Sequence, residues 1–195
     1  YVDTGAMYRA IALYLIRRGV APEEKEAIAK ECAGADVSIT YQNGEQVVSL
    51  NGENVNGLIR TDEVTRMSSA ASAVPAVRAR LLDLQRGLAA RHDVLMDGRD
   101  IGTCILPDAD VKIFLTASTA VRAKRRFDEL TAKGDTSETL ESVEAKIVKR
   151  DEADRNREIS PLREAEDAVH LDTPDMTIEQ AVEAVLSICR QKGCL

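Results

Sequence analysis

The hydrophobic positions at the start of the chain follow a helical spacing. Apolar residues recur three and four positions apart over residues 7–16, and Gly19 ends the pattern. A proline followed by two glutamates favours a second, shorter helix over residues 22–33. The apolar pair at residues 1–2 runs directly into Asp3-Thr4-Gly5, which is typical of a strand that ends in a turn before a helix.

An alternating pattern replaces the helical one between residues 36 and 58. Polar and apolar residues alternate over 37–41, residues 46–50 run back as a second strand, and Asn43-Gly44 between them favours a tight hairpin turn. Residues 53–55 add a short third strand. We therefore expect a small antiparallel module over residues 36–58, which is too small to be stable alone.

The remaining two thirds of the chain alternate between helical patterns and short apolar runs. The expected helices cover residues 61–73, 75–91, a basic segment around 122–126, 140–153 and 177–192. The expected strands cover residues 94–96, 111–115 and 168–171. Short apolar strands separated by helices indicate an α/β fold, in which helices cover both faces of a parallel sheet and the antiparallel module is an insertion.

Composition narrows the class of protein. The 195 residues suffice for one domain, or for one domain with an insert, and a hydrophobic fraction of 44% supports a substantial core. The net charge of −7 argues against a surface for nucleic-acid polymers or anionic membranes, both of which attract positive fields. No apolar run approaches the ~18 residues that span a membrane.

The cysteines and histidines carry no recognisable chemical motif. The cysteines are scattered without a CxxC spacing, so we expect free thiols and a cytoplasmic protein without a metal framework. We also expect His92 and His170 to occupy ordinary surface or core positions. The four cysteines are Cys32, Cys104, Cys189 and Cys194.

Polar clusters follow three of the expected strands. They are Asp3-Thr4-Gly5, Asp97-Gly98-Arg99-Asp100 and Asp172-Thr173. Ligands of open parallel sheets bind beyond the carboxyl ends of the strands, so the first two clusters are candidate sites. Asp and Gly also make ordinary turns and helix caps, which is the favoured interpretation for the third cluster.

The densest charge cluster covers residues 149–157. Arg150, Asp154 and Arg157 share one helical face, which fits either a solvated face of ion pairs or a phosphate site. Arginine favours the second interpretation, because its fork of donors matches phosphate oxygens. The following segment, residues 159–162, has the composition of a hinge.

Three further residues are candidates for binding. Arg9 lies on the first turns of a helix that begins at Thr4-Gly5, where backbone amides already favour an anion. Arg78, near the start of the fourth helix, and Ser69, among small residues, are ambiguous by themselves.

Four segments of the chain together resemble bacterial-type cytidylate kinase. They are Asp3-Thr4-Gly5-Ala6-Met7-Tyr8-Arg9, Ile59-Arg60-Thr61, residues 97–103, and the run from Arg150 to Leu162. Residues 36–58 resemble the enlarged nucleotide-monophosphate-binding insert of that family. The resemblance implies a P-loop NTPase-like, three-layer parallel sheet, with residues 1–35 and 59–195 as the core kinase domain and residues 150–162 as a lid.

The resemblance also implies an activity. ATP would phosphorylate CMP or dCMP with Mg²⁺ in pyrimidine nucleotide metabolism, and the enzyme would be a cytoplasmic monomer. By position, the resemblance implies that Arg9, Arg99 and Arg157 bind the CMP phosphate and that Ser69, Arg78 and Asp100 bind the cytosine edge. It implies that Arg150 and Asp154 bind the ribose, that Arg155 contacts the transferring phosphates, and that Thr4 also binds substrate. The catalytic residues would be Arg99, Arg155 and Arg157. Positioning and charge neutralisation dominate phosphoryl transfer, so a set rich in arginine suits this chemistry.

One part of the family pattern is missing from the chain. No Gly-Lys dipeptide occurs in the 195 residues, so we expect the phosphate loop and the first strand to precede Tyr1. Two alternatives stay open: a catalytically incompetent fragment that binds CMP, and a kinase of another small acceptor on the same fold. Asp100 with Ser69 and Arg78 favours cytosine, because a carboxylate accepts from the N4 amino group while Arg and Ser donate to N3 and O2.

Overall fold

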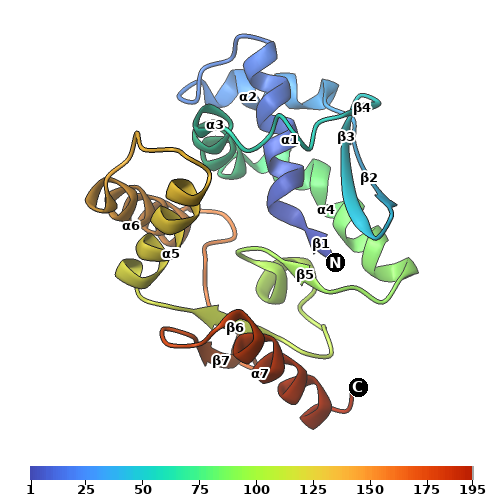
Figure 1. The fold of residues 1–195 in the computed structure, drawn as a ribbon. Coiled ribbons are helices and arrows are strands. Elements are labelled where there is room, and N and C mark those ends of the chain that lie inside the picture. Colours follow the sequence, from blue (N-terminus) through green and yellow to red (C-terminus); the bar gives the residue numbers. More distant parts are fainter. Residues whose placement is uncertain (195) are drawn as a thin grey trace. The chain divides into compact units, whose positions relative to one another are not determined.

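The computed structural model describes residues 1–194, which form two compact units (Figure 1). Unit 1 comprises Tyr1–Ile105 and Arg157–Pro161, and unit 2 comprises Leu106–Asn156 and the chain from Leu162 onward. Each unit holds a pair of parallel strands among helices, which confirms the predicted α/β class. Within residues 1–194, no helix has both the length and the apolar character needed to cross a bilayer.

Helix α1 (Thr4–Arg17) forms the centre of unit 1. Met7, Ile11 and Leu15 are fully buried along one stripe, as the helical spacing of apolar residues predicts. Burial of each such side chain contributes about 1.5–3 kcal/mol to folding. The other helices of this unit are α2 (Lys25–Glu31), the short η1 (Cys32–Gly34), α3 (Asp62–Ser72) and α4 (Pro75–Arg91), and α3 packs along α1 (Figure 1).

Helix α2 begins later than the sequence pattern predicts. The Glu24 side chain accepts a hydrogen bond from the Ala21 amide at 2.8 Å, and the Glu24 amide bonds to the Ala21 carbonyl at 3.1 Å. These bonds close a turn, so regular helix starts at Lys25 rather than at Pro22.

The predicted antiparallel module is confirmed as the three-stranded sheet β2 (Val37–Gln42), β3 (Glu45–Leu50) and β4 (Glu53–Asn54). Asn43 and Gly44 both have positive φ, at 53° and 82°, as the tight turn requires. Val48 and Leu50 are buried in the same core as α1, and Arg17 of α1 forms a two-pronged ion pair with Glu53. The module is therefore packed into unit 1.

The parallel pair of unit 1 positions a short polar segment. Strands β1 (Val2–Asp3) and β5 (Met96–Asp97) pair in parallel register, and the π-helical turn η2 (Ile101–Ile105) follows β5. A Cβ on Gly98 would lie 2.7 Å from Thr4 Oγ1, so only glycine permits this approach.

Unit 2 pairs β6 (Ile113–Thr116) with β7 (Val169–Asp172) in parallel. Its helices are α5 (Thr119–Ala132), α6 (Leu140–Asn156) and α7 (Ile178–Gln191). Arg122 of α5 donates from both terminal nitrogens to Asp151 of α6, at 3.2 and 2.6 Å, which ties the two helices together. After β7, the Thr173 amide bonds to the Thr116 carbonyl at 2.9 Å, so this strand end has the structural role that the sequence favoured.

Candidate functional site

Two arginines flank a buried aspartate in unit 1. Arg78 Nη2 donates a hydrogen bond to Asp100 Oδ2, and Arg157 Nη2 lies 3.5 Å from Asp100 Oδ1. All three side chains are at most 8% exposed. We call these three residues the Arg-Asp-Arg cluster, and the structure brings them together from three separate segments of the chain.

The local backbone explains where each member of this cluster lies. Arg78 occupies the first turn of α4, which begins at Pro75, and its Nη1 donates to the Ser72 carbonyl at 3.2 Å. Asp100 leads into η2, where its carbonyl accepts the Cys104 amide at 2.9 Å. Arg157 is held by its own loop, because its Nε donates to the Ser160 carbonyl at 2.6 Å.

The electrostatics of the cluster favour an anionic or acceptor-rich ligand. The cluster places two guanidinium groups and one carboxylate in a region shielded from water. Burying charges is costly unless they are paired and hydrogen-bonded, so guanidinium groups held here suit an anionic partner. Arginine also presents several donors in a fixed plane, which suits a flat heterocycle or a phosphate.

Tyr8 lies against the cluster, although the sequence assigned it no binding role beyond its place in the helix and in the motif Asp3–Arg9. The Arg78 guanidinium carbon is 5.5 Å from the centroid of the Tyr8 ring, a cation–π arrangement. Burial raises the pKa of Tyr8 above its ordinary value. A tyrosine beside Arg9 in the motif is the signal that could have marked it.

Three other predicted residues of unit 1 occupy supporting positions. Arg9 donates to Thr65 Oγ1 at 2.7 Å and to the Ile59 carbonyl at 3.1 Å, and Thr4 Oγ1 donates to the Asp97 carbonyl at 2.7 Å. Ser69 is half-buried on α3. These contacts hold the start of α1 against the segments that follow β4 and β5.

Arg99 and the neighbouring carboxylates form a more exposed group at the ends of β1 and β5. Tyr1 donates to Asp97 Oδ1 at 3.0 Å, and Arg60 pairs with Asp3 at 2.6 Å. Loss of hydration raises the pKa of Asp97, and the nearby Asp3 carboxylate raises it further, whereas Arg99 lowers it. Burial, together with Asp97, raises the pKa of Tyr1 to about 12.

The predicted residues of unit 2 lie on α6. Arg150 Nε is 3.9 Å from Asp154 Oδ2, a pair four residues apart on one helical face. Asp154 is buried, and its carbonyl accepts the Leu162 amide at 2.8 Å, whereas Arg155 is exposed. This end of α6 therefore carries one buried carboxylate and two accessible arginines.

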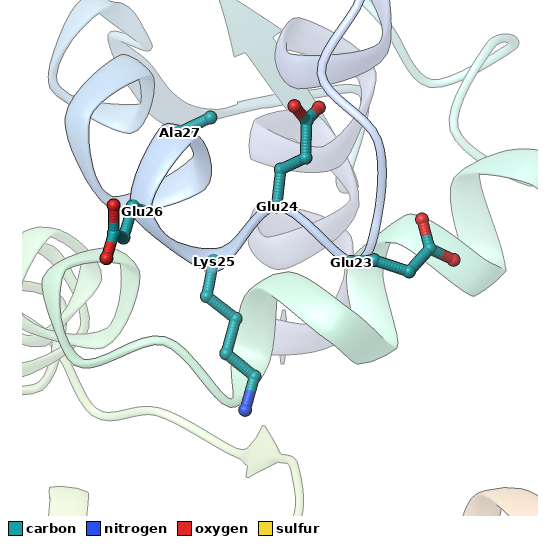
Figure 2. A pocket seen from close by; sticks show the side chains of 5 residues that line it. All are labelled: Glu23, Glu24, Lys25, Glu26 and Ala27. Atoms are coloured by element: carbon teal, nitrogen blue, oxygen red, sulfur yellow. The ribbon is translucent and has the colours of Figure 1, made fainter.

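An open pocket elsewhere on unit 1 contains none of the predicted residues. Figure 2 shows its lining, Glu23, Glu24, Lys25, Glu26 and Ala27, which is one consecutive segment. The side chains of Glu24 and Lys25 point in opposite directions (Figure 2). The pocket therefore gathers no set of converging groups.

Metal ligands and cysteine thiols are the other groups in the described chain that could carry chemistry. Among residues 1–194, no group of three His, Cys, Asp or Glu side chains is arranged to hold a metal ion by itself. The four cysteines are free thiols, as predicted.

Comparison with known proteins identifies the family of the chain. The family model for cytidylate kinase matches residues 1–191. The cytidylate kinase of Lactobacillus johnsonii is 45% identical over 192 residues, which are 98% of this chain and 83% of that protein. The cytidylate kinase of Mycolicibacterium paratuberculosis is 45% identical over 99% of this chain and 85% of its own length. On the match of nearly its whole length, this chain belongs to the cytidylate kinase family.

Proposed function

We propose that the protein transfers the γ-phosphoryl group of ATP to CMP or dCMP. A phosphate oxygen of the nucleoside monophosphate attacks the γ-phosphorus, the bond to the β-phosphate oxygen breaks, and ADP leaves with CDP or dCDP formed. Membership of the cytidylate kinase family supports this reaction. The observation that carries the choice of base is the Asp100 carboxylate held between Arg78 and Arg157.

The cluster matches the hydrogen-bonding edge of cytosine. The base offers an amino donor at N4 beside acceptors at N3 and O2. Asp100 accepts from the amino group, and Arg78 with Ser69 donates to the two acceptors. Uracil carries an acceptor at position 4 and a donor at N3, so both contacts would oppose like groups, and a buried site penalises such unpaired groups strongly.

Arginines account for the rest of the proposed mechanism. Arg9, Arg99 and Arg157 bind the CMP phosphate, and Arg155 neutralises charge on the transferring group. Arg150 and Asp154 contact the ribose, and Thr4 supports the substrate site beside β5. Fixed positive charges of this kind lower the barrier because phosphoryl transfer spreads negative charge over the phosphate oxygens.

We propose that Mg²⁺ binds together with ATP. Mg²⁺ prefers phosphate oxygens and water with one or two carboxylates. When bound, the ion supplies charge neutralisation on the phosphates. ATP therefore serves as donor, and residues 150–162 act as a lid that excludes water during transfer.

We propose that the enzyme is a monomer and that it acts in the cytoplasm. The resemblance to the family implies a monomer, and the free thiols fit the reducing cytoplasm. A panel of acceptors measured by coupled ADP release tests the activity. We expect ADP to form with CMP and dCMP and only weakly with UMP or AMP. Calorimetric binding of CMP without ATP-dependent turnover would instead identify a binding module.

A further inference from the structure

Two acceptors hold one nitrogen of the Arg9 guanidinium group. Arg9 Nη1 donates to Thr65 Oγ1 at 2.7 Å and to the Ile59 carbonyl at 3.1 Å. A terminal guanidinium nitrogen carries two hydrogens, so these bonds use both of them. Because the guanidinium group is flat and rigid, two bonds from one nitrogen fix its plane as well as its position. Ile59 contributes a backbone atom, so Thr65 is the side chain of the two acceptors.

The Thr65 hydroxyl is suited to accept this bond because its own proton has another partner. Thr65 Oγ1 donates to the Thr61 carbonyl at 2.8 Å, four residues earlier. A hydroxyl has one proton and two lone pairs, so the oxygen then presents lone pairs to Arg9. Thr61 is the N-cap of α3 and accepts the Val64 amide at 3.2 Å. The turn that carries Thr65 is therefore itself fixed.

The packing of α1 against α3 gives this hydrogen bond a rigid base. Met7 of α1 is buried in the same core as Val64 and Met67 of α3. Arg9 and Thr65 are half-buried, where a bond from a charged donor is stronger than in open water. Valine has the shape of threonine and would pack in the same space, so packing alone does not account for the hydroxyl.

We propose that Thr65 is a positioning residue for substrate recognition, which orients the guanidinium group of Arg9 for the phosphate of the nucleoside monophosphate. The proposal rests on the proposed function, in which Arg9 binds the CMP phosphate. It adds a residue that acts through Arg9 and needs no contact with substrate. Ser69, which the proposed function assigns to the base, lies four residues after Thr65 on the same face of α3. One helix face thus supports recognition of both ends of the nucleotide.

Calorimetric titration with CMP and with cytidine tests this role, because the two ligands differ only in the phosphate. Thr65→Val removes the hydroxyl and keeps the shape of the side chain, whereas Thr65→Ser keeps the hydroxyl. We expect Thr65→Val to raise the Kd for CMP about tenfold and to leave the Kd for cytidine nearly unchanged. Thr65→Ser should bind both ligands as the wild type does.

Thr131→Val is the matched control. The Thr131 hydroxyl also donates to a carbonyl four residues earlier in its helix, that of Phe127, at 2.9 Å. Thr131 lies on α5 and is assigned no role in the site, so this variant should keep both Kd values.

A double variant tests whether Thr65 acts through the arginine. Arg9→Met removes the guanidinium group and should raise the Kd for CMP by at least as much as Thr65→Val does. Thr65→Val combined with Arg9→Met is expected to match Arg9→Met alone, because the hydroxyl then has no guanidinium group to orient.

The outcomes separate the role of Thr65 from the proposed function. The positioning role is wrong if Thr65→Val keeps the wild-type ratio of the two Kd values, if Thr65→Ser behaves like Thr65→Val, or if the two effects multiply in the double variant. Should Thr65→Val fail to fold, Thr65→Ala decides in its place, because alanine is the better helix former. A raised Kd for CMP in Arg9→Met without an effect of Thr65→Val overturns the role of Thr65 alone. No effect of Arg9→Met overturns the assigned phosphate contact as well.

Discussion

Arg157 Nη2 lies 3.5 Å from Asp100 Oδ1, and both side chains are 6% exposed. The same aspartate accepts a hydrogen bond from Arg78, so one carboxylate links a proposed base-binding arginine to a proposed phosphate-binding arginine. A ligand that bonds to Asp100 would therefore also affect the charge environment of Arg157. This relationship leads to the first two predictions.

The first prediction concerns the stability of the cluster. Asp100→Asn keeps the shape of the side chain but removes the negative charge that Arg78 and Arg157 share in a buried region. Loss of one partner from a buried ion pair costs about 3–5 kcal/mol, so we expect the free energy of unfolding to fall by an amount of that order. Urea unfolding measures it, and Asp93→Asn at an exposed position is the control. A variant as stable as the control would contradict the buried pairing.

The second prediction concerns the chemical step. Arg157→Met removes a charge that the proposal places on the CMP phosphate during transfer, so we expect kcat to fall about 10²- to 10³-fold. Arg163→Met changes an exposed arginine in the following segment and should keep full activity. Initial rates of ADP formation at saturating CMP and ATP provide the comparison. Equal kcat values for the two variants would remove Arg157 from the mechanism.

The third prediction tests the close approach between β5 and α1. Gly98→Ala would place a Cβ 2.7 Å from Thr4 Oγ1 and 2.8 Å from the Ile101 side chain. Overpacking of this kind costs about 1–3 kcal/mol, so the free energy of unfolding should fall by that amount. Gly57→Ala is the matched control, because its Cβ would meet no atom within 4 Å. Equal thermal denaturation midpoints for both variants would argue against the tight contact.

The fourth prediction concerns pH. The pKa of Asp97 is raised above its ordinary value of 3.8 by loss of hydration and by Asp3, although part of the residue's surface is exposed. A raised pKa means that the folded state favours the protonated acid, so the cost of ionising Asp97 sets in as the pH rises above the ordinary pKa and is complete above the folded pKa. Asp97→Asn should therefore gain stability relative to the wild type at neutral pH, and this gain should shrink as the pH falls toward the ordinary pKa.

Unfolding in urea at several pH values measures the difference between the two proteins. The difference between the free energies of unfolding of Asp97→Asn and the wild type cancels the pH dependence that both proteins share through their other carboxylates. Asp93→Asn again supplies an exposed control, whose difference from the wild type should not vary with pH in this way. A gain for Asp97→Asn that grows on acidification would reverse the sign expected from the raised pKa.

Local patterns predicted the elements of the fold well. The apolar stripe of α1 and the Asn43-Gly44 turn depend on interactions between residues close in sequence, and both appear in the structure. The strand over residues 111–115 is shifted, since β6 spans Ile113–Thr116. Its bounds are set by pairing with β7 and by the bond from the Thr173 amide to the Thr116 carbonyl, which no local pattern records.

The site was predicted only in part, because it depends on contacts between residues that lie far apart in the sequence. Arg78, Asp100 and Arg157 lie on separate segments, and motif resemblance, rather than periodicity, placed them in one site before the structure showed their contact. Tyr8 was missed because it occupies a buried face of a helix, where sequence patterns indicate packing. Only the three-dimensional contact of Tyr8 with Arg78 shows that this part of the core supports the site.

The central claim is that the Arg-Asp-Arg cluster recognises a cytidine nucleotide. Calorimetric titration of the wild type and of Asp100→Asn with CMP and with UMP tests it most directly. We predict that the wild type binds CMP more tightly than UMP by at least about a hundredfold, and that Asp100→Asn loses most of this preference, because Asn can present a donor to uracil O4 as well as an acceptor to the cytosine amino group. Equal binding of CMP and UMP by the wild type, or an unchanged preference in Asp100→Asn, would contradict the claim.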